Sequence, residues 1–316
     1  MNPILKNAIK SDIKSVDKTL SNLIKPQSKL SFDVYKQVVE SGKRLRPLIV
    51  LYSALSLNFK DSNKALVLGS IIELIHTASL LHDDIIDDAQ YRRGREAANI
   101  IFGTKPAVLG GDYLYSLAFN MVLDFDIEIA KVISKAAYML AEGEIKEIEN
   151  AFKTDITIDD YYDVIYKKTA VLLEASSISG CLLANIEYRK NFEEYGKNLG
   201  FAFQIKDDCL DYESDVETLG KDVGIDLKEG KVTLPVLLSM EKDSSLKSKL
   251  KEYFEKKDER LLLDITNTVK EKGLKESIEL AREFSDKAKE SISFLNKSRY
   301  RDYLFAIADY AIERKK

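Results

Sequence analysis

Residues 71–95 read IIELIHTASLLHDDIIDDAQYRRGR, an apolar, helix-compatible run that ends in four aspartates within six residues. On a helix, Asp83 and Asp87 lie one turn apart on one face, separated by about 40° of rotation. Asp84 and Asp88 form a second such pair on the adjoining face. Two carboxylates about 6 Å apart repel by roughly 3 kcal/mol at an effective dielectric constant of about 20. No Lys or Arg lies inside the cluster, so the pattern predicts a bound cation.

Carboxylate oxygens in this arrangement suit Mg²⁺, which takes one or two carboxylates and leaves other positions to water and phosphate. A solvated helix end is the more common explanation of a single acidic cluster. The same D-D-x-x-D spacing recurs at Asp207, Asp208 and Asp211, however. This repetition favours two metal-binding motifs.

The composition indicates one ordinary globular protein with an all-α fold. The 316 residues are 45% hydrophobic and 32% charged, with few prolines and glycines and no alternating strand pattern. A net charge of −4 gives no case for nucleic acid binding. The N-terminus lacks an apolar signal core and no run of 18 apolar residues appears, so we expect no membrane span and a cytoplasmic location. Cys181 and Cys209 are too few for a zinc site or a disulfide framework.

The chain reads as successive helices joined by short connections. We expect helices over 3–25, 32–58 with an interruption at 41–47, 63–90, 106–124, 128–152, 157–184 and 191–212, and a charged helical region after 234. The small residues 175–180 predict a close-packed or kinked segment. The glycine- and lysine-rich loop after the second acidic motif is too long for a simple connector and predicts a lid or binding loop.

Two basic segments are candidates for anion binding. SGKRLRP at 41–47 carries Lys43, Arg44 and Arg46, and a solvated basic turn explains it equally well. Lys168 and Thr169 lie midway along an otherwise apolar helix, where a cation usually needs a partner.

Two acidic motifs facing each other across an apolar cavity would hold Mg²⁺ and a bridging polyphosphate. The cations available for phosphate oxygens are Lys43, Arg46, Arg92, Arg93, Lys168 and Lys221. The chain has no P-loop and no serine or cysteine nucleophile beside a base. The chemistry that this set suits is electrostatic stabilisation of a diphosphate leaving group, with a hydrocarbon as the rest of the substrate.

Five ordered motifs carry a family resemblance: GKRLRP, LLHDDIIDDA…RRG, KT at 168–169, FQIKDDCLDY and GKDVGIDLKEGKVTLP. Together, over about residues 40–238, they resemble the trans-isoprenyl diphosphate synthase (polyprenyl synthetase) family. The fuller first motif most resembles the long-chain members, such as octaprenyl diphosphate synthases. Two departures are Lys206, where the family usually has a neutral residue, and Tyr212, where some members have another acid.

The resemblance implies an isoprenoid synthase-type helical bundle around a central cavity, with residues 1–316 as a single domain and usually a homodimer. It implies about three Mg²⁺ per active site. Their ligands would be Asp83, Asp87 and Asp207, supported by Asp84, Asp208 and Asp211. Isopentenyl diphosphate would be bound by Lys43, Arg46, His76 and Arg93. The allylic diphosphate would be bound by Arg92, Lys168, Thr169, Gln204 and Lys221.

The implied reaction begins with ionisation of an allylic diphosphate such as farnesyl diphosphate. The double bond of isopentenyl diphosphate then attacks the cation, and a proton is lost to the released diphosphate. His76 and His82, the only histidines, point in different directions on a helix and do not predict a two-histidine metal site. For His82 we favour a structural role.

Family members border the growing hydrocarbon with the residues one turn before the first aspartate. Here these are Ala78 and Ser79, both small, which predicts a tunnel open past farnesyl length. Phe119 and Val122 are candidates for the tunnel floor, and ordinary core packing explains them equally well. Phe119→Ala should then lengthen the product and Ala78→Phe should shorten it.

Three alternatives stay open. A geranylgeranyl or heptaprenyl diphosphate synthase differs only in tunnel depth. A terpene cyclase shares the fold but normally lacks a second D-D-x-x-D motif. A non-catalytic subunit usually loses the aspartate motifs, and this chain keeps both. The sequence does not select the pathway that the product feeds, such as a quinone side chain.

Overall fold

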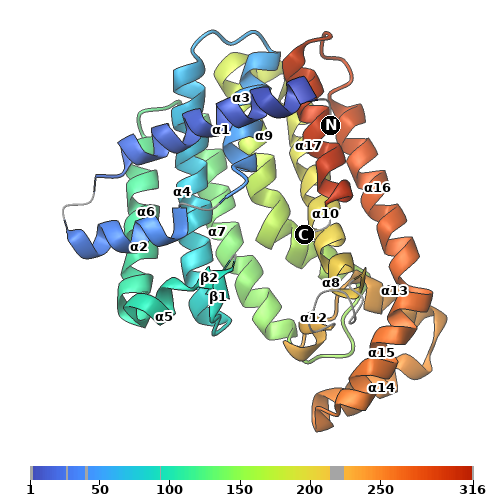
Figure 1. Ribbon diagram of the computed structural model, residues 1–316. Helices are drawn as coiled ribbons and strands as arrows, with labels where there is room; N and C mark the ends of the chain where they lie inside the picture. The colour runs from blue at the N-terminus through green and yellow to red at the C-terminus, as the bar shows by residue number, and fades with distance from the viewer. Residues whose placement is uncertain (1–2, 26–27, 40–41, 93, 214–223, 315–316) are drawn as a thin grey trace. The chain divides into compact units, whose positions relative to one another are not determined.

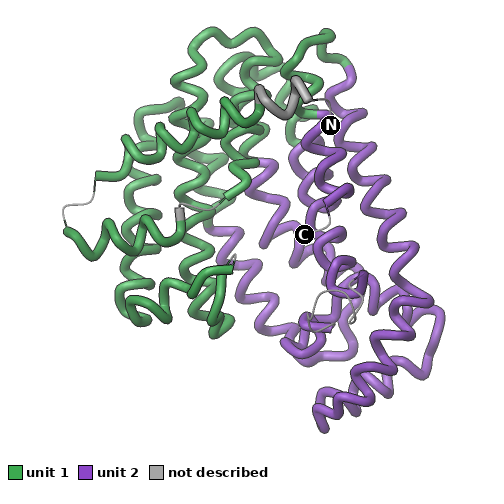
Figure 2. The backbone as a smooth tube through the Cα atoms, viewed as in Figure 1, with its two compact units in different colours: residues 1–137, 175–193, 294–304 green, residues 138–174, 194–293, 305–316 purple. Residues whose placement is uncertain are grey.

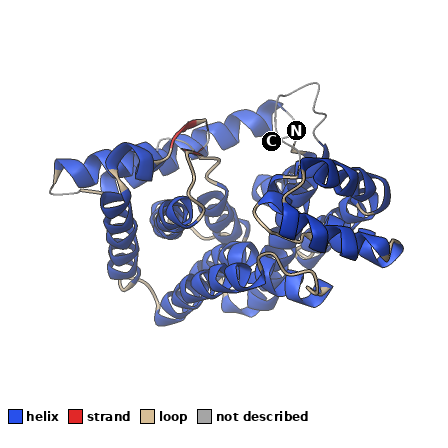
Figure 3. Cartoon of the chain, turned by 90° about the horizontal axis from the view of Figure 1, so that it is seen from below, coloured by secondary structure: helices blue, strands red, loops and turns tan. Residues whose placement is uncertain are grey.

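The computed structural model of the protein describes residues 3–25, 28–39, 42–92, 94–213 and 224–314. Helices make up nearly all of this part of the chain, and its strands are one short hairpin (Figures 1 and 3). The predicted all-α class is therefore confirmed. By internal contacts the chain divides into two compact units (Figure 2). Unit 1 is 1–137, 175–193 and 294–304, and unit 2 is 138–174, 194–293 and 305–316.

Unit 1 holds the first acidic motif. Its elements in chain order are α1 (Pro3–Leu23), α2 (Lys29–Val39), α3 (Leu45–Ser56), α4 (Ser62–Ile86), β1 (Tyr91–Arg92), β2 (Arg95–Glu96), α5 (Ala98–Phe102), α6 (Thr104–Val122) and η2 (Ile186–Tyr188). The strands pair antiparallel, with Tyr91 opposite Glu96. The sequence reading missed this hairpin and α5.

Helix α4 is the central helix of unit 1 and packs against α1, α3 and α6. Asp61 caps its start, because the Asp61 carboxylate accepts the backbone N–H of Lys64. Among the described residues, α4 is the one helix that is both apolar enough and long enough to cross a membrane. Most of its apolar stretch is buried inside the protein, as in the core helix of a soluble protein.

Close helix contacts in unit 1 depend on small residues. A Cβ on Gly69 of α4 would lie 2.7 Å from the Pro47 Cα of α3. A Cβ on Gly180 would lie 2.4 Å from the carbonyl oxygen of Val50. Normal carbon contacts lie near 3.5–4.0 Å, so these positions accept only glycine. The predicted close packing of residues 175–180 is confirmed at Gly180.

The first two of the four described helices that contribute residues to both units are α7 (Ile127–Asn150) and α9 (Val171–Ala184). The other elements of unit 2 are α8 (Ile158–Ile165), η1 (Tyr166–Ala170), α10 (Arg189–Glu213, from residue 194), α12 (Ile225–Lys228), α13 (Leu234–Lys242), α14 (Ser245–Lys256), α15 (Glu259–Lys272) and α16 (Leu274–Ser291). Helix α17 (Arg299–Glu313) enters this unit at residue 305. Side chains of α8, α10, α13, α14, α15 and α16 form most of its apolar core.

The predicted helix over 157–184 is interrupted by η1, one turn of π-helix. Thr157 begins the segment with a capping box, in which its hydroxyl and the Asp160 carboxylate satisfy each other's backbone N–H groups. A π-turn holds one more residue than an α-turn and commonly occurs at functional sites. Lys168 and Thr169 both lie in it.

Candidate active site

The first acidic motif lies at the C-terminal end of α4. This helix ends at Ile86, so Asp83 is in its last turn and Asp87 caps it, with the Asp87 N–H donating to the Asp83 carbonyl at 2.8 Å. Asp88 follows with φ of 50°, in the left-handed region. The predicted helical pair of Asp84 with Asp88 is therefore wrong, because the chain leaves the helix between them.

Asp84 is buried and bonded to Arg92. The Arg92 Nε donates to Asp84 Oδ1 at 2.6 Å, and Nη2 contacts the same oxygen. The hairpin returns Arg92 to the helix end, with Gly94 at φ of 79° in its turn. A cation therefore does offset this part of the cluster. Arg92 was assigned to the allylic diphosphate, and here it holds Asp84; Arg93, its predicted neighbour in function, lies outside the described residues.

Tyr115 of α6 is a neighbour of the first motif that the sequence reading did not assign. Burial, and then the charge of Asp83, raise the pKa of Tyr115 to about 12. Its ring stacks on Phe119 with centroids 6.2 Å apart. Phe119 is partly buried, whereas Val122 is a core residue at 3% exposure. Of the two floor candidates, Phe119 is the one joined to the motif.

The residues one turn before the motif differ in burial. Ala78 is fully buried, and Ser79 is partly exposed, with its hydroxyl donating to the His76 carbonyl at 2.9 Å. His76 is also partly exposed on α4. His82 Nε2 lies 3.2 Å from the Val108 carbonyl oxygen, which fits the structural role that we favoured.

The basic turn before α3 presents its cations in different directions. Arg44 has φ of 53° and turns inward, where its guanidinium pairs with Asp17 at 2.8 Å and with Glu73 at 3.3 Å. The expectation that all three cations form one anion site is therefore wrong for Arg44. Lys43 is exposed and Arg46 is partly exposed, so the exposure of both is compatible with the predicted binding of an anion.

The second acidic motif lies near the C-terminal end of α10. Asp207 is the exposed member, and the guanidinium of Arg314, which follows α17, pairs with it at 2.9 Å. Arg314 also lies over the Phe203 ring at 3.8 Å and donates to the Phe203 carbonyl at 2.8 Å. The sequence reading assigned no functional residue to the charged helical region after 234 and missed this contact.

Asp208 is the buried member of the motif. The Tyr161 hydroxyl donates to it at 2.6 Å and the Gln204 amide at 2.8 Å, while the Thr169 hydroxyl donates to the Gln204 carbonyl oxygen at 2.7 Å. Burial raises the pKa of Asp208 to about 7, opposed by these hydrogen bonds and reinforced by Asp207 and Glu147. Three predicted residues of unit 2 are thus connected.

Asp211 accepts the backbone N–H groups of Ile225 at 3.1 Å and Asp226 at 3.2 Å. It therefore fixes the start of α12, in the loop predicted to bind ligand. Burial raises the pKa of Asp211, and it raises that of Asp226 strongly. Lys221, which the resemblance assigned to this loop, lies outside the described residues.

The two departures from the family pattern have structural explanations. Lys206 is buried and pairs with Glu213 at 2.5 Å, so its charge has a carboxylate partner. Tyr212 is a fully buried core residue of unit 2, and it leaves the three aspartates of the motif unchanged.

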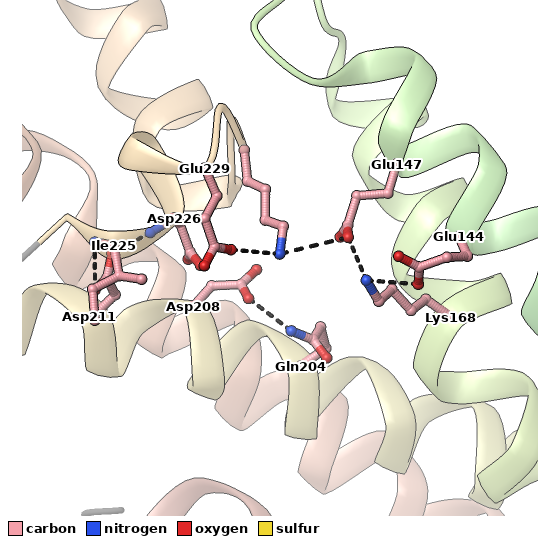
Figure 4. A network of polar contacts seen from close by, with 10 residues as sticks. Glu144, Glu147, Lys168, Gln204, Asp208, Asp211, Ile225, Asp226 and Glu229 are labelled. Atoms are coloured by element: carbon pink, nitrogen blue, oxygen red, sulfur yellow. Dashed lines mark hydrogen bonds and ion pairs between the residues drawn. The ribbon is translucent and has the colours of Figure 1, made fainter. Parts of the chain in front are cut away.

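Lys168 has the partners that its apolar surroundings required. Its Nζ lies 2.9 Å from Glu144 Oε2 and also contacts Glu147, both on α7 (Figure 4). Burial opposes the charge of Lys168, but Glu147 and Glu144 outweigh it and raise the pKa. Glu147 also lies 3.6 Å from Lys231 Nζ. The sequence reading missed both glutamates; their i,i+3 spacing beside Gly143 was the available signal.

The site is acidic and its donors are the hard oxygens that Mg²⁺ prefers. Within the described ranges, no three acidic, histidine or cysteine side chains converge as a ready-made metal site. Burial is the main cause of the raised pKa of Asp208, and the nearby charges of Asp207 and Glu147 add to it; a divalent cation would offset those charges. The residues therefore fit an ion held by a few carboxylates together with phosphate and water.

Comparison with known proteins agrees with this geometry. Residues 28–269 match the Polyprenyl synthetase family. The chain is 38% identical to octaprenyl diphosphate synthase of Haemophilus influenzae over 86% of its own length and 84% of the relative.

Two solved structures share the fold over nearly the whole chain. One is a polyprenyl synthase from Caulobacter crescentus complexed with calcium and isoprenyl diphosphate, with a TM-score of 0.89, 31% identity and 99% and 97% coverage of the two chains. The other is a geranylgeranyl pyrophosphate synthetase from Pyrococcus horikoshii, with a TM-score of 0.90, 34% identity and 98% coverage of both. The chain belongs to the polyprenyl synthetase family of prenyltransferases.

Proposed function

We propose that this prenyltransferase is a long-chain all-trans polyprenyl diphosphate synthase, of octaprenyl type, that extends an allylic diphosphate with isopentenyl diphosphate. The observation that carries the proposal is the pair of D-D-x-x-D motifs at helix ends, each set among cations and apolar helices. The octaprenyl relative and the small residues Ala78 and Ser79 support the long product.

The metal would be held by Asp83 and Asp87 from one motif and Asp207 from the other, with Asp84, Asp208 and Asp211 behind them. Mg²⁺, about three ions per site, would supply the positive charge that stabilises the departing diphosphate. The calcium and isoprenyl diphosphate bound by the Caulobacter relative support a divalent ion beside a diphosphate.

The protein's own groups bind, orient and exclude water. Lys168 offers an ammonium group, and Thr169 orients Gln204 on the same face as Asp208. Isopentenyl diphosphate would be bound by Lys43, Arg46, His76 and Arg93. The allylic diphosphate would be bound by Lys168 together with Arg92 and Lys221. The C–O bond of the allylic substrate breaks, the isopentenyl double bond attacks the cation, and the lost proton passes to the released diphosphate.

A second copy of the chain completes the proposal as a homodimer. Exposed apolar side chains lie along one stripe of α7, at Ile127, Tyr138 and Ile145 with exposed fractions of 62%, 60% and 54%. Such a stripe on a surface helix is typical of an association face. Sedimentation of the wild type and of Ile145→Glu tests this, and a monomeric wild type would contradict it. We also propose a cytoplasmic location and a single catalytic domain over 1–316.

The test is an assay with farnesyl and isopentenyl diphosphate, with and without Mg²⁺, that measures diphosphate release and separates the dephosphorylated products by length. Octaprenyl product supports the proposal. Geranylgeranyl or heptaprenyl product selects the shorter-chain alternative, and absence of diphosphate release selects the non-catalytic subunit.

A matched pair of variants separates the motif from its surroundings. Asp87→Asn removes a proposed metal ligand and should abolish most activity. Asp88→Asn changes the same charge one residue later, at a left-handed backbone position that asparagine tolerates, and should stay active. Equal losses in the two variants would contradict the assignment.

A further inference from the structure

Glu147 is a carboxylate shared by two lysines. Its Oε2 contacts Lys168 Nζ (Figure 4). The same oxygen lies 3.6 Å from Lys231 Nζ. Each lysine also has a carboxylate of its own: Glu144 for Lys168 at 2.9 Å and Glu229 for Lys231 at 2.7 Å. Two ammonium groups that converge on one oxygen form a site for a compact anion.

The backbone around Lys168 is fixed by a glycine. A Cβ on Gly143 would lie 2.7 Å from the Lys168 backbone nitrogen, so α7 contacts η1 closely at this point. Glu147 follows Gly143 by one helical turn and is therefore aimed at the same π-turn. The side chains of Glu147 and Lys168 are 20% and 25% exposed, so their charges are only partly solvated. Partial burial makes the loss of a partner costly for either charge.

The shared carboxylate belongs to the polar network of the second motif. Lys168 precedes Thr169, whose hydroxyl bonds to Gln204, and Gln204 bonds to Asp208. Glu147 therefore lies where the proposed function brings a diphosphate to Lys168.

We propose that Glu147 is a positioning residue that holds Lys168 and Lys231 together in the substrate-free enzyme. When the substrate binds, its diphosphate replaces the Glu147 carboxylate as the partner of the two ammonium groups. This rests on the proposed function. A diphosphate arriving at Lys168 competes with a resident carboxylate for the same ammonium groups. Glu147 thus weakens diphosphate binding in the ground state and speeds release of the inorganic diphosphate product.

The test is Glu147→Gln, which keeps the size of the side chain and removes its charge. Neither lysine loses its only partner, because Glu144 and Glu229 remain. We expect inorganic diphosphate to bind about tenfold more tightly by calorimetry at fixed Mg²⁺ concentration, about 1.4 kcal/mol. The KM for the allylic substrate and kcat should both fall, because product release slows. Glu147→Ala should also bind diphosphate more tightly, which keeps the test valid if one variant folds poorly.

Glu144→Gln is the matched control, since it removes the same charge from the other α7 carboxylate that pairs with Lys168. Its effect on diphosphate affinity should be clearly smaller. Equal or weaker diphosphate binding by both Glu147 variants, or an equal gain in Glu144→Gln, would overturn the inference. A wild-type protein that neither binds inorganic diphosphate nor releases it from farnesyl and isopentenyl diphosphate would instead overturn the proposed function.

Discussion

Gly200 of α10 sets how closely this helix approaches the π-turn that carries Lys168 and Thr169. A Cβ at Gly200 would lie 2.3 Å from the Ala170 Cα and 2.4 Å from the Ala170 Cβ. Both distances are more than 1 Å short of a normal carbon contact of about 3.5 Å. Gly200→Ala must therefore push α10 and η1 apart by about 1.2 Å.

The separation should break the contact that orients Gln204. The Thr169 hydroxyl and the Gln204 carbonyl oxygen are 2.7 Å apart, and a displacement of about 1.2 Å takes them beyond hydrogen-bond distance. A displacement of about 1 Å at a catalytic group can cost about 100-fold in rate. We expect kcat/KM for the allylic substrate to fall between about tenfold and 100-fold.

The effect on stability should be smaller than the effect on activity. Overpacking costs about 1–3 kcal/mol, and replacement of a mid-helix glycine by alanine returns up to about 1 kcal/mol. The control is Gly110→Ala in α6, whose new Cβ meets the buried Val34 side chain of α2 at 2.7 Å, so that it overpacks a helix contact away from η1. Steady-state kinetics and denaturant unfolding of both variants are the measurements. A Gly200→Ala enzyme with wild-type kcat/KM would refute the reasoning.

The remaining predictions concern product length, metal affinity and acid stability. Ser79→Phe should shorten the product and should destabilise the fold less than Ala78→Phe, because Ser79 is partly exposed and Ala78 is buried. Phe119→Ala should lengthen the product. Unchanged product lengths would contradict the prediction of an open tunnel. Arg314→Gln should lower the Mg²⁺ concentration for half-maximal activity a few-fold, because Asp207 loses a competing cation; an unchanged or higher concentration would contradict this. A hydrogen bond from Lys272 of α15 is the main cause of the lowered pKa of Asp243, and hydrogen bonds from Ser245 contribute further. A lowered pKa in the folded state contributes stability that is fully present above a pH of about 4 and is lost progressively on further acidification, so Asp243→Ala should reduce the melting temperature near neutral pH, and the reduction should shrink steadily as the pH falls below about 4; a reduction that does not change with pH would count against it.

Local patterns in the sequence predicted most of the helices. The apolar run before the first motif gave α4 within a few residues of its observed ends, Ser62 and Ile86. The π-turn at 166–170 was not predictable in this way, because its spacing departs from the period that identifies an α-helix. The hairpin around Gly94 is too short to show a strand pattern.

Charged residues were harder to assign because their partners are distant in the sequence. Arg44 looked like part of a surface anion site, and its partners, Asp17 and Glu73, lie 27 and 29 residues away. The partner requirement of Lys168 was predicted correctly from its apolar surroundings. That Glu147 meets it, 21 residues earlier, becomes visible only once α7 and η1 are packed together.

The π-turn has a consequence for which sequence changes the protein can accept. Removal of a single residue from 166–170 would let the segment relax into regular α-helix, which costs no hydrogen bonding. Because a π-turn holds one more residue than an α-turn, the helical segments on either side would keep their rotation about the axis. Tyr161 would still face Asp208, whereas the side chains inside the turn, Lys168 and Thr169 among them, would be reset. A single deletion in this turn should therefore preserve the fold and disturb the site.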